Sequence, residues 1–295
     1  MHPALQFLTF IGVLFGALVT GTVIGLGIVW VAYGAKTIGG IMALDPNVPH
    51  FITAIWILQF AGTTLPILAV PVFFAYVVVN DPHEYLRATP RFAWLLMVVV
   101  FAVMIASSPL IEFLTNLNQK IPVPHFLQWM VDNAVKEEKV MTAMMDMKTL
   151  WDAIYNVLFI GLLTAVVEEL MFRGCLQTIF EKWTKNIHVA IWITAILFSA
   201  FHMDFYGFLP RVLLGAMFGY FVAWSDSVWP AVWAHFLNNS TIVVVNYLYQ
   251  QKLIKLNPDD NHVFNNAGYS ISLLIVLFLF WVYYYIATNK KPAVA

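Results

Sequence analysis

Residues 153–174 read AIYNVLFIGLLTAVVEELMFRG, and this stretch decides how the chain folds. An uncharged apolar run ends at Val167, and Glu168, Glu169 and Arg173 follow it directly. A transmembrane helix needs about 20 predominantly apolar residues, and a charge at membrane depth costs at least a few kcal/mol and is usually functional. The stretch therefore predicts a membrane helix that carries three candidate site residues near its centre.

The composition of the whole chain indicates an integral membrane protein. Hydrophobic residues make up 61% of the sequence, and charged residues make up 11%, against about 25% in an average soluble domain. The net charge of −1 gives no electrostatic argument for a nucleic-acid partner. Cys175 is the only cysteine, which excludes an intramolecular disulfide and a cysteine-built metal site. We therefore expect the lipid bilayer to be the main partner of this hydrophobic chain.

The apolar runs predict an all-α fold, a polytopic membrane helix bundle of about eight transmembrane helices. Counting about 20 residues per crossing, we place the spans at 5–33, 51–79, 91–114, 148–181, 187–204, 208–225, 229–250 and 268–288. The connection 116–147 carries apolar residues near helical spacing, which predicts an additional amphipathic helix at the interface. We expect one integral membrane domain, 1–295, in which 148–250 forms the core that carries the functional motifs.

Small residues four positions apart predict close packing of some of these helices. Three such pairs lie within the predicted spans: Gly12 with Gly16, Gly21 with Gly25, and Gly215 with Gly219. Because glycine is common in membrane helices, the alternative that these residues are merely tolerated in lipid stays open.

The three charges divide into a pair and a remainder. Residues four apart share a helix face, so Glu169 and Arg173 can pair, while Glu168 points to a neighbouring face. One alternative is a buried ionic network that only fixes helix packing. A second carboxylate without a cation favours a functional role instead, because such a group can act as a general base.

Polar residues in two later spans are the expected partners of Glu168. His202 ends the fifth apolar run, one turn after Phe198, and His235 lies one turn before Asn239 in the seventh. The other histidines fall in connections or at span ends. Each of these two imidazoles alone is compatible with a satisfied buried side chain, but together with an unpaired glutamate they favour a hydrolytic site.

The order of these residues resembles the EExxxR, FxxxH and HxxxN motifs of the CPBP family, which includes the type II CAAX prenyl endopeptidases. The resemblance covers the region from Glu168 to Asn239 and implies an eight-span fold and intramembrane endopeptidase activity on a membrane-associated polypeptide, such as CAAX-like C-terminal processing. It also implies that the chain is an integral multi-pass protein of a prokaryotic cell membrane.

The resemblance assigns a role to each motif residue. Glu168 matches the glutamate that activates water, and His202 matches the histidine that holds or polarises it. His235 and Asn239 match the pair that stabilises the tetrahedral oxyanion, while Glu169, Arg173 and Phe198 support the site.

A metalloprotease mechanism and a metal-free glutamate mechanism both agree with this family resemblance. If a metal such as zinc takes part, Glu168, His202 and His235 are the expected ligands. We favour no metal and no cofactor, because these residues come from separate helices and lack the compact HExxH spacing.

Two other functions stay open at this point. A non-proteolytic immunity or binding factor would retain the same motifs, and a proton-coupled transporter can also use a buried glutamate with two histidines. The chain shows no inverted repeat, which argues against transport.

Overall fold

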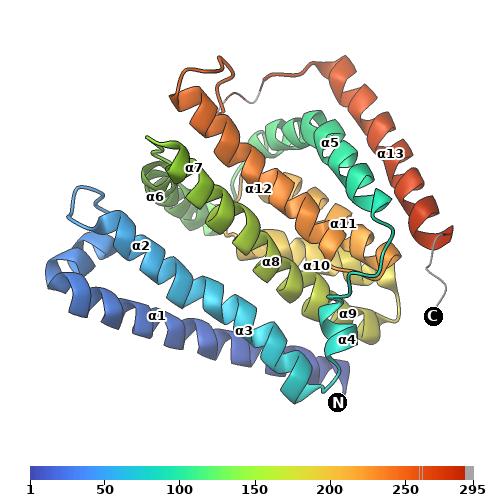
Figure 1. Ribbon diagram of the computed structural model, residues 1–295, viewed down its shortest axis with the longest axis horizontal. Helices are drawn as coiled ribbons and strands as arrows, with labels where there is room; N and C mark the ends of the chain where they lie inside the picture. Colours follow the sequence, from blue (N-terminus) through green and yellow to red (C-terminus); the bar gives the residue numbers. More distant parts are fainter. Residues whose placement is uncertain (259, 261, 290–295) are drawn as a thin grey trace.

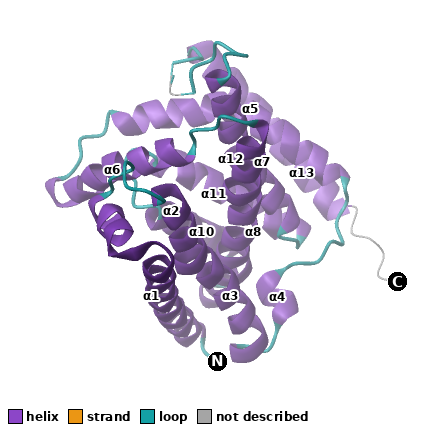
Figure 2. Ribbon diagram, turned by 60° about the vertical axis from the view of Figure 1, so that its left-hand side comes forward, coloured by secondary structure: helices purple, strands orange, loops and turns teal. Residues whose placement is uncertain are grey.

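The chain forms an all-α bundle in the computed structural model, which describes residues 1–258, 260 and 262–289. Figures 1 and 2 show helices throughout this part of the chain and no strand within it. This architecture confirms the predicted fold class. Residues 259, 261 and 290–295 of the expected domain 1–295 lie outside the described residues.

The α-helices and the π-helical or 3₁₀ segments between them follow one another closely. In chain order they are α1 (Pro3–Ala43), α2 (Phe51–Gln59), η1 (Phe60–Thr64), α3 (Leu65–Phe73), η2 (Phe74–Val78), α4 (Pro82–Leu86), α5 (Leu95–Gln119), η3 (His125–Leu127), α6 (Gln128–Met144), α7 (Leu150–Asn156), η4 (Val157–Leu163), α8 (Thr164–Glu169), η5 (Leu170–Leu176), α9 (Gln177–Thr184), α10 (Ile187–Phe201), α11 (Phe208–Ser225), α12 (Trp229–Gln250) and α13 (Asn266–Asn289).

A helix occupies each of the eight predicted spans, but within the described residues only six helices are long and apolar enough to cross a membrane. These candidates are Pro3–Ala43, Phe51–Val78, Leu95–Gln119, Leu150–Thr184, Phe208–Ser225 and Asn266–Asn289. The fifth predicted span, 187–204, is the short apolar helix α10. The seventh is α12, in which His235, Asn239 and Asn246 interrupt the apolar sequence. Polar residues that serve a site inside the bundle therefore reduce the hydropathy signal of the helix that carries them.

Glycines account for two details of the N-terminal helices. The first predicted span ends at residue 33, and α1 loses helical geometry at Gly34, whose φ of 81° suits glycine. Gly21 of α1 packs so closely against η1 that an added Cβ would lie 2.2 Å from the carbonyl oxygen of Ala61. Close packing is therefore confirmed at Gly21 and wrong at Gly12 and Gly16, where no atom lies within 4 Å of an added Cβ.

The predicted amphipathic helix is α6, in the connection between α5 and α7. No residue of α6 is buried, so the helix lies on the outside of the bundle. The residues that follow it reach inward, since Met145 and Met147 pack with Ala153 and Val243. The chain is thereby anchored immediately before α7 begins.

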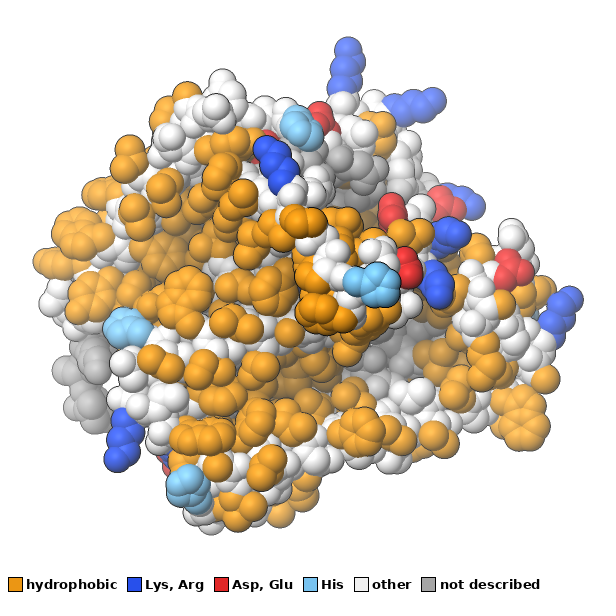
Figure 3. Space-filling view, turned by 180° about the vertical axis from the view of Figure 1, so that it is seen from behind, with side chains coloured by type: hydrophobic (Ala, Val, Ile, Leu, Met, Phe, Trp, Pro, Cys, Tyr) orange, Lys and Arg blue, Asp and Glu red, His pale blue; other side chains and the backbone are white. Residues whose placement is uncertain are grey.

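Two apolar clusters build the bundle. One joins α1, α3, α9 and α10, with Phe10, Ile67 and Ile179 among its buried residues. The other joins α5, α11, α12 and α13 around Val100 and Phe221. Hydrophobic side chains also cover much of the molecular face in Figure 3, as expected for contact with lipid. The candidate site lies where α8, η5, α10, α11 and α12 meet.

Candidate active site

A short helix between two π-helical segments carries the paired glutamates. The continuous helix Leu150–Thr184 has π geometry in η4 and again in η5, and α8 between them ends at Glu169. Single π turns are frequent at functional sites, because the wider turn re-aims side chains and frees carbonyl groups from the regular ladder. Both glutamates are buried, with 9% of Glu168 and 0% of Glu169 exposed.

Glu169 holds two donors from different parts of the bundle. Its Oε1 accepts a hydrogen bond from Nη1 of Arg173 at 2.8 Å and another from Nδ1 of His235 at 2.9 Å. The pairing with Arg173 is the one that their spacing of four indicates. The bond to His235 links the helix of the glutamates to α12 and fixes the imidazole orientation.

Aromatic rings and a backbone carbonyl complete the surroundings of Arg173. The guanidinium lies 4.4 Å from the ring centroid of Phe198 and 5.4 Å from that of Phe218. Its Nη2 donates to the carbonyl oxygen of Gly215 at 3.1 Å. A Cβ at Gly215 would lie 3.0 Å from Cα of Ala195, so glycine lets α11 approach α10 closely. Arg173 is thus held in place by charge, hydrogen bonding and cation–π contact.

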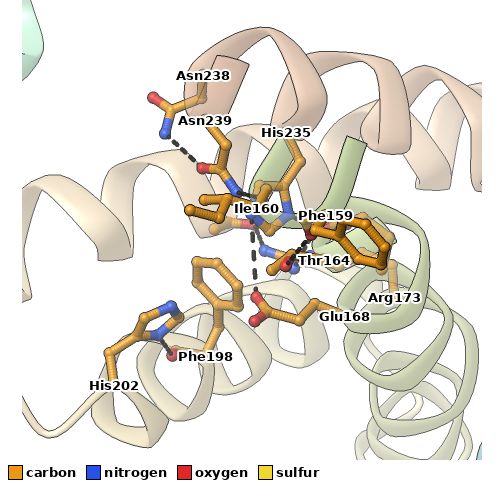
Figure 4. Close-up of polar contacts among 12 residues, drawn as sticks. Phe159, Ile160, Thr164, Glu168, Arg173, Phe198, His202, His235, Asn238 and Asn239 are labelled. Atoms are coloured by element: carbon orange, nitrogen blue, oxygen red, sulfur yellow. Dashed lines mark hydrogen bonds and ion pairs between the residues drawn. The ribbon is translucent and has the colours of Figure 1, made fainter. Parts of the chain in front are cut away.

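Glu168 stands apart from this ionic pair and faces His235. Its Oε2 lies 3.9 Å from Nε2 of His235, which is too long for a direct hydrogen bond. Oε2 is buried and has no hydrogen-bond partner among the described residues. Figure 4 shows Glu168 and His235 facing each other, with Asn239 one turn further along α12. A carboxylate oxygen that lacks a protein donor is available to accept one from a bound molecule.

His202 lies at the edge of the site and is half-buried. Its Nδ1 contacts the carbonyl oxygen of Phe198 at 2.8 Å, so this nitrogen carries the proton and Nε2 is the acceptor in the neutral ring. The ring of Phe198 stands between the two histidines, with centroids 5.0 Å from His202 and 5.8 Å from His235. His202 interacts with Glu168 through its charge and makes no direct bond to it among the described contacts.

Asn239 is tied to the π-helical segment η4. Its Nδ2 donates to the carbonyl oxygen of Ile160 at 3.2 Å, and its Oδ1 accepts from Nδ2 of Asn238 at 3.2 Å. Helix α12 comes close to η4 here, because a Cβ on Gly161 would lie 2.4 Å from Oγ of Ser240. The motif amide therefore has a defined orientation.

The structure gathers all seven residues of the three motifs into one region but does not bond them all together. Glu169, Arg173 and His235 form a direct network, Phe198 packs between them, and Glu168 and His202 face the same space. Three further contributors were missed from sequence, namely Phe218, Gly161 and Asn238. The polar run Asn238-Asn239-Ser240 in an apolar helix was a usable signal for Asn238. No sequence signal pointed to Phe218, which stacks on His235 with a distance of 5.4 Å between ring centroids.

The side chains have donors that suit zinc but not the arrangement that would hold it. Both His202 and His235 use Nδ1 for a hydrogen bond to an oxygen, which leaves Nε2 as the nitrogen that a metal would take. Among the described residues, however, no three His, Cys, Asp or Glu side chains lie close enough together to hold an ion. The expected ligands Glu168, His202 and His235 thus do not fit a metal as they are placed here.

Comparison with known proteins agrees with the motifs. Residues 150–241 match the family described as type II CAAX prenyl endopeptidase Rce1-like, and this segment contains all three motifs. The match confirms the family resemblance over that segment.

One curated relative is the uncharacterized protein YpbD of Bacillus subtilis (strain 168). It is 27% identical over 89 residues, and the alignment covers 29% of this chain and 42% of the relative. The chain thus spans less than half the length of the curated relative that it matches. No solved structure matches the chain significantly.

Proposed function

We propose, from the type II CAAX prenyl endopeptidase family that residues 150–241 match and from the geometry around Glu168, that this chain is an intramembrane endopeptidase. It hydrolyses a peptide bond of a membrane-associated polypeptide without a metal. The observation that carries the proposal is the division of the two glutamates. Glu169 accepts hydrogen bonds from Arg173 and His235 through Oε1, whereas neither carboxylate oxygen of Glu168 accepts a hydrogen bond from a described residue.

Glu168 acts as the general base in this proposal. A water bound to Oε2 gives its proton to the carboxylate as its oxygen attacks the scissile carbonyl. The resulting carboxylic acid then returns the proton to the leaving amine as the carbon–nitrogen bond breaks, which restores the carboxylate. His202, with Nε2 as acceptor, helps to orient the water from the other side of Phe198.

His235 and Asn239 face the carbonyl oxygen of the substrate. Because His235 donates from Nδ1 to Glu169, its Nε2 carries a proton only when the ring is an imidazolium. Asn239 adds the Nδ2 hydrogen that Ile160 does not use. Donors placed in this way stabilise a developing oxyanion, and removal of one costs about 2.7–4 kcal/mol of activation free energy.

Replacement of the base tests the proposal. The Glu168→Gln variant keeps the size of the side chain but cannot take a proton, so cleavage should fall by at least about 100-fold. Purified full-length protein in lipid vesicles is incubated with a broad panel of prenylated and unprenylated peptides, and products are identified by mass spectrometry. Lys148→Gln, at an exposed position, is the matched control. A folded wild-type protein that shows no Glu168-dependent cleavage would overturn the protease function and favour a binding or immunity factor.

Metal removal tests the second half of the proposal. After dialysis against a strong zinc chelator, the wild-type cleavage rate should stay within about twofold, because His235 is held by Glu169 and not by an ion. A loss of cleavage that added zinc restores would show that the mechanism depends on metal.

A further inference from the structure

Asn238 lies beside the proposed site and belongs to none of the three motifs. Its Nδ2 donates to Oδ1 of Asn239 at 3.2 Å, and Asn239 donates in turn to the carbonyl oxygen of Ile160. These bonds form a chain from α12 to the π-helical segment η4, as Figure 4 shows. The chain contains two amides and ends on a backbone carbonyl.

The direction of this chain follows from the group at its end. A carbonyl oxygen can only accept, so Asn239 must turn its Nδ2 toward Ile160 and its Oδ1 toward Asn238. Asn238 must then present its own Nδ2. If Asn238 could not donate, the bond to Ile160 alone would hold the Asn239 amide, and the direction of its second Nδ2 hydrogen would be less well fixed.

Asn238 also lines a groove on the other side of α12. This groove has a volume of about 390 Å³ and lies between α5 and α12, with Met104, Ile105 and Ser108 on one wall and Leu237, Asn238 and Ile242 on the other. Ile105 and Ile242 are 60% and 54% exposed, so the groove opens on the outside of the bundle. Asn238 is thus in contact both with the groove and with Asn239.

We propose that Asn238 is a positioning residue, which holds the Asn239 amide in the orientation that stabilises the oxyanion. This inference rests on the proposed function.

A readout that needs no substrate tests the positioning. The side-chain amide signal of Asn239 is followed by ¹⁵N NMR in the full chain in lipid nanodiscs, with Asn239→Gln used to assign it. Asn238→Asp keeps the shape but removes the donor, so the Asn239 signal should shift and its hydrogens should exchange faster. Asn246→Asp makes the same change two turns along α12, where the structure gives no hydrogen-bond partner among the described residues. It should leave the signal in place. An unchanged signal in Asn238→Asp overturns the proposal.

A double-mutant cycle tests the consequence for cleavage. Asn238→Ala should lower kcat by about 10-fold or more with little change in KM, and it should have no further effect in an Asn239→Ala background, because it acts only through that residue. Asn238→Gln, which can still donate, should recover part of the rate. Additive losses in the cycle would refute the positioning role while leaving the protease function intact. Glu168-independent cleavage would instead refute the function, so the two failures are distinguishable.

Discussion

Glu169 and Arg173 have no exposed surface, and this makes the consequences of separating them predictable. Their ion pair of 2.8 Å lies at 0% exposure for both side chains. A buried pair stabilises little against an apolar replacement, but removal of one partner leaves an uncompensated charge and costs about 3–5 kcal/mol. The pair therefore organises the site more than it stabilises the fold.

We expect Arg173→Ala to lower the free energy of unfolding by about 3–5 kcal/mol. The double variant Glu169→Gln/Arg173→Met removes both charges and should lose less. Unfolding is measured by thermal denaturation in detergent. Lys148→Ala breaks an exposed pair with Asp146, 79% and 61% exposed, and should change stability by no more than about 0.5 kcal/mol. Equal losses in Arg173→Ala and in the double variant would contradict the argument.

The motif residues were predicted from sequence because their spacing is local and their polarity is anomalous in an apolar run. A separation of four residues fixes the pairing of Glu169 with Arg173 before any tertiary contact is known. The bond from His235 to Glu169 was not predictable, since it depends on how α12 packs against η5. Its consequence, that Nε2 is the nitrogen facing Glu168, therefore comes from the structure alone.

At the scale of elements, the packing of α12 on η4 depends on Gly161. An added Cβ would lie 2.4 Å from Oγ of Ser240 and 3.5 Å from the ring of Phe236. Atoms that close require either a new Ser240 rotamer or a shift of the two helices, and overpacking of this kind costs about 1–3 kcal/mol. The bond between Asn239 and Ile160 crosses the same contact, so activity should suffer with stability.

Gly161→Ala should accordingly lower the unfolding free energy by about 1–3 kcal/mol and reduce cleavage. Because Ser240 Oγ is the clashing atom, the double variant Gly161→Ala/Ser240→Ala should recover most of both. Gly12→Ala, where an added Cβ meets nothing within 4 Å, is the control and should be neutral or slightly stabilising. A loss in Gly161→Ala that the second substitution does not relieve would disprove the clash.

The π-helical segments η4 and η5 were not predictable from the sequence. Helix length and apolar periodicity place a helix over 148–181, but no residue pattern within it marks the local change to i→i+5 bonding. Hydropathy alone also could not fix the number of membrane crossings. Polar residues of α12 such as His235 and Asn239 serve the site inside the bundle and hide the helix from a hydropathy scan.

Glu137 on the external helix α6 is influenced by the charges of Asp204 in the α10–α11 connection and Arg211 at the start of α11. Partial desolvation and, secondly, repulsion from Asp204 raise the pKa of Glu137 above its ordinary value, while Arg211 opposes this. A carboxyl whose pKa is raised on folding adds stability below its unfolded pKa near 4.5, and that stability is lost as the pH rises through the folded pKa.

Hydrogen exchange of the α6 amides should therefore be slowest in mildly acidic solution and accelerate as the pH rises through the raised pKa, after correction for the intrinsic rate. Glu137→Gln should abolish this extra dependence. Glu138→Gln, the adjacent carboxyl on the same exposed helix, serves as the control and should retain it. Identical pH profiles for the wild type and Glu137→Gln would show that Glu137 does not cause the pH dependence.

For the whole molecule, the depth of the α10–α11 turn follows from helix lengths. Helix α10 has 15 residues and at ~1.5 Å per residue spans only about 22 Å, against a hydrocarbon core of about 30 Å. Helix α12 has 22 residues and is long enough to cross at about 33 Å. If α10 stops within the bilayer, α11 returns to the side from which α10 entered and neither helix crosses, which leaves six crossings with α12 among them; if both cross, there are eight. Both numbers place the termini on one side, but only the first places Met203 at membrane depth.

Cysteine labelling in a Cys175→Ser background separates these arrangements. Met203 is 54% exposed on the protein itself, so Met203→Cys should react with a small permeable maleimide, yet a bulky impermeant one should not reach it if the turn lies below the membrane surface. Lys252→Cys, in the exposed connection after α12, should react with both. If the impermeant reagent labels both positions equally, α10 crosses the bilayer completely. His202 would then lie near the membrane surface, and water would have direct access to Glu168 from that side.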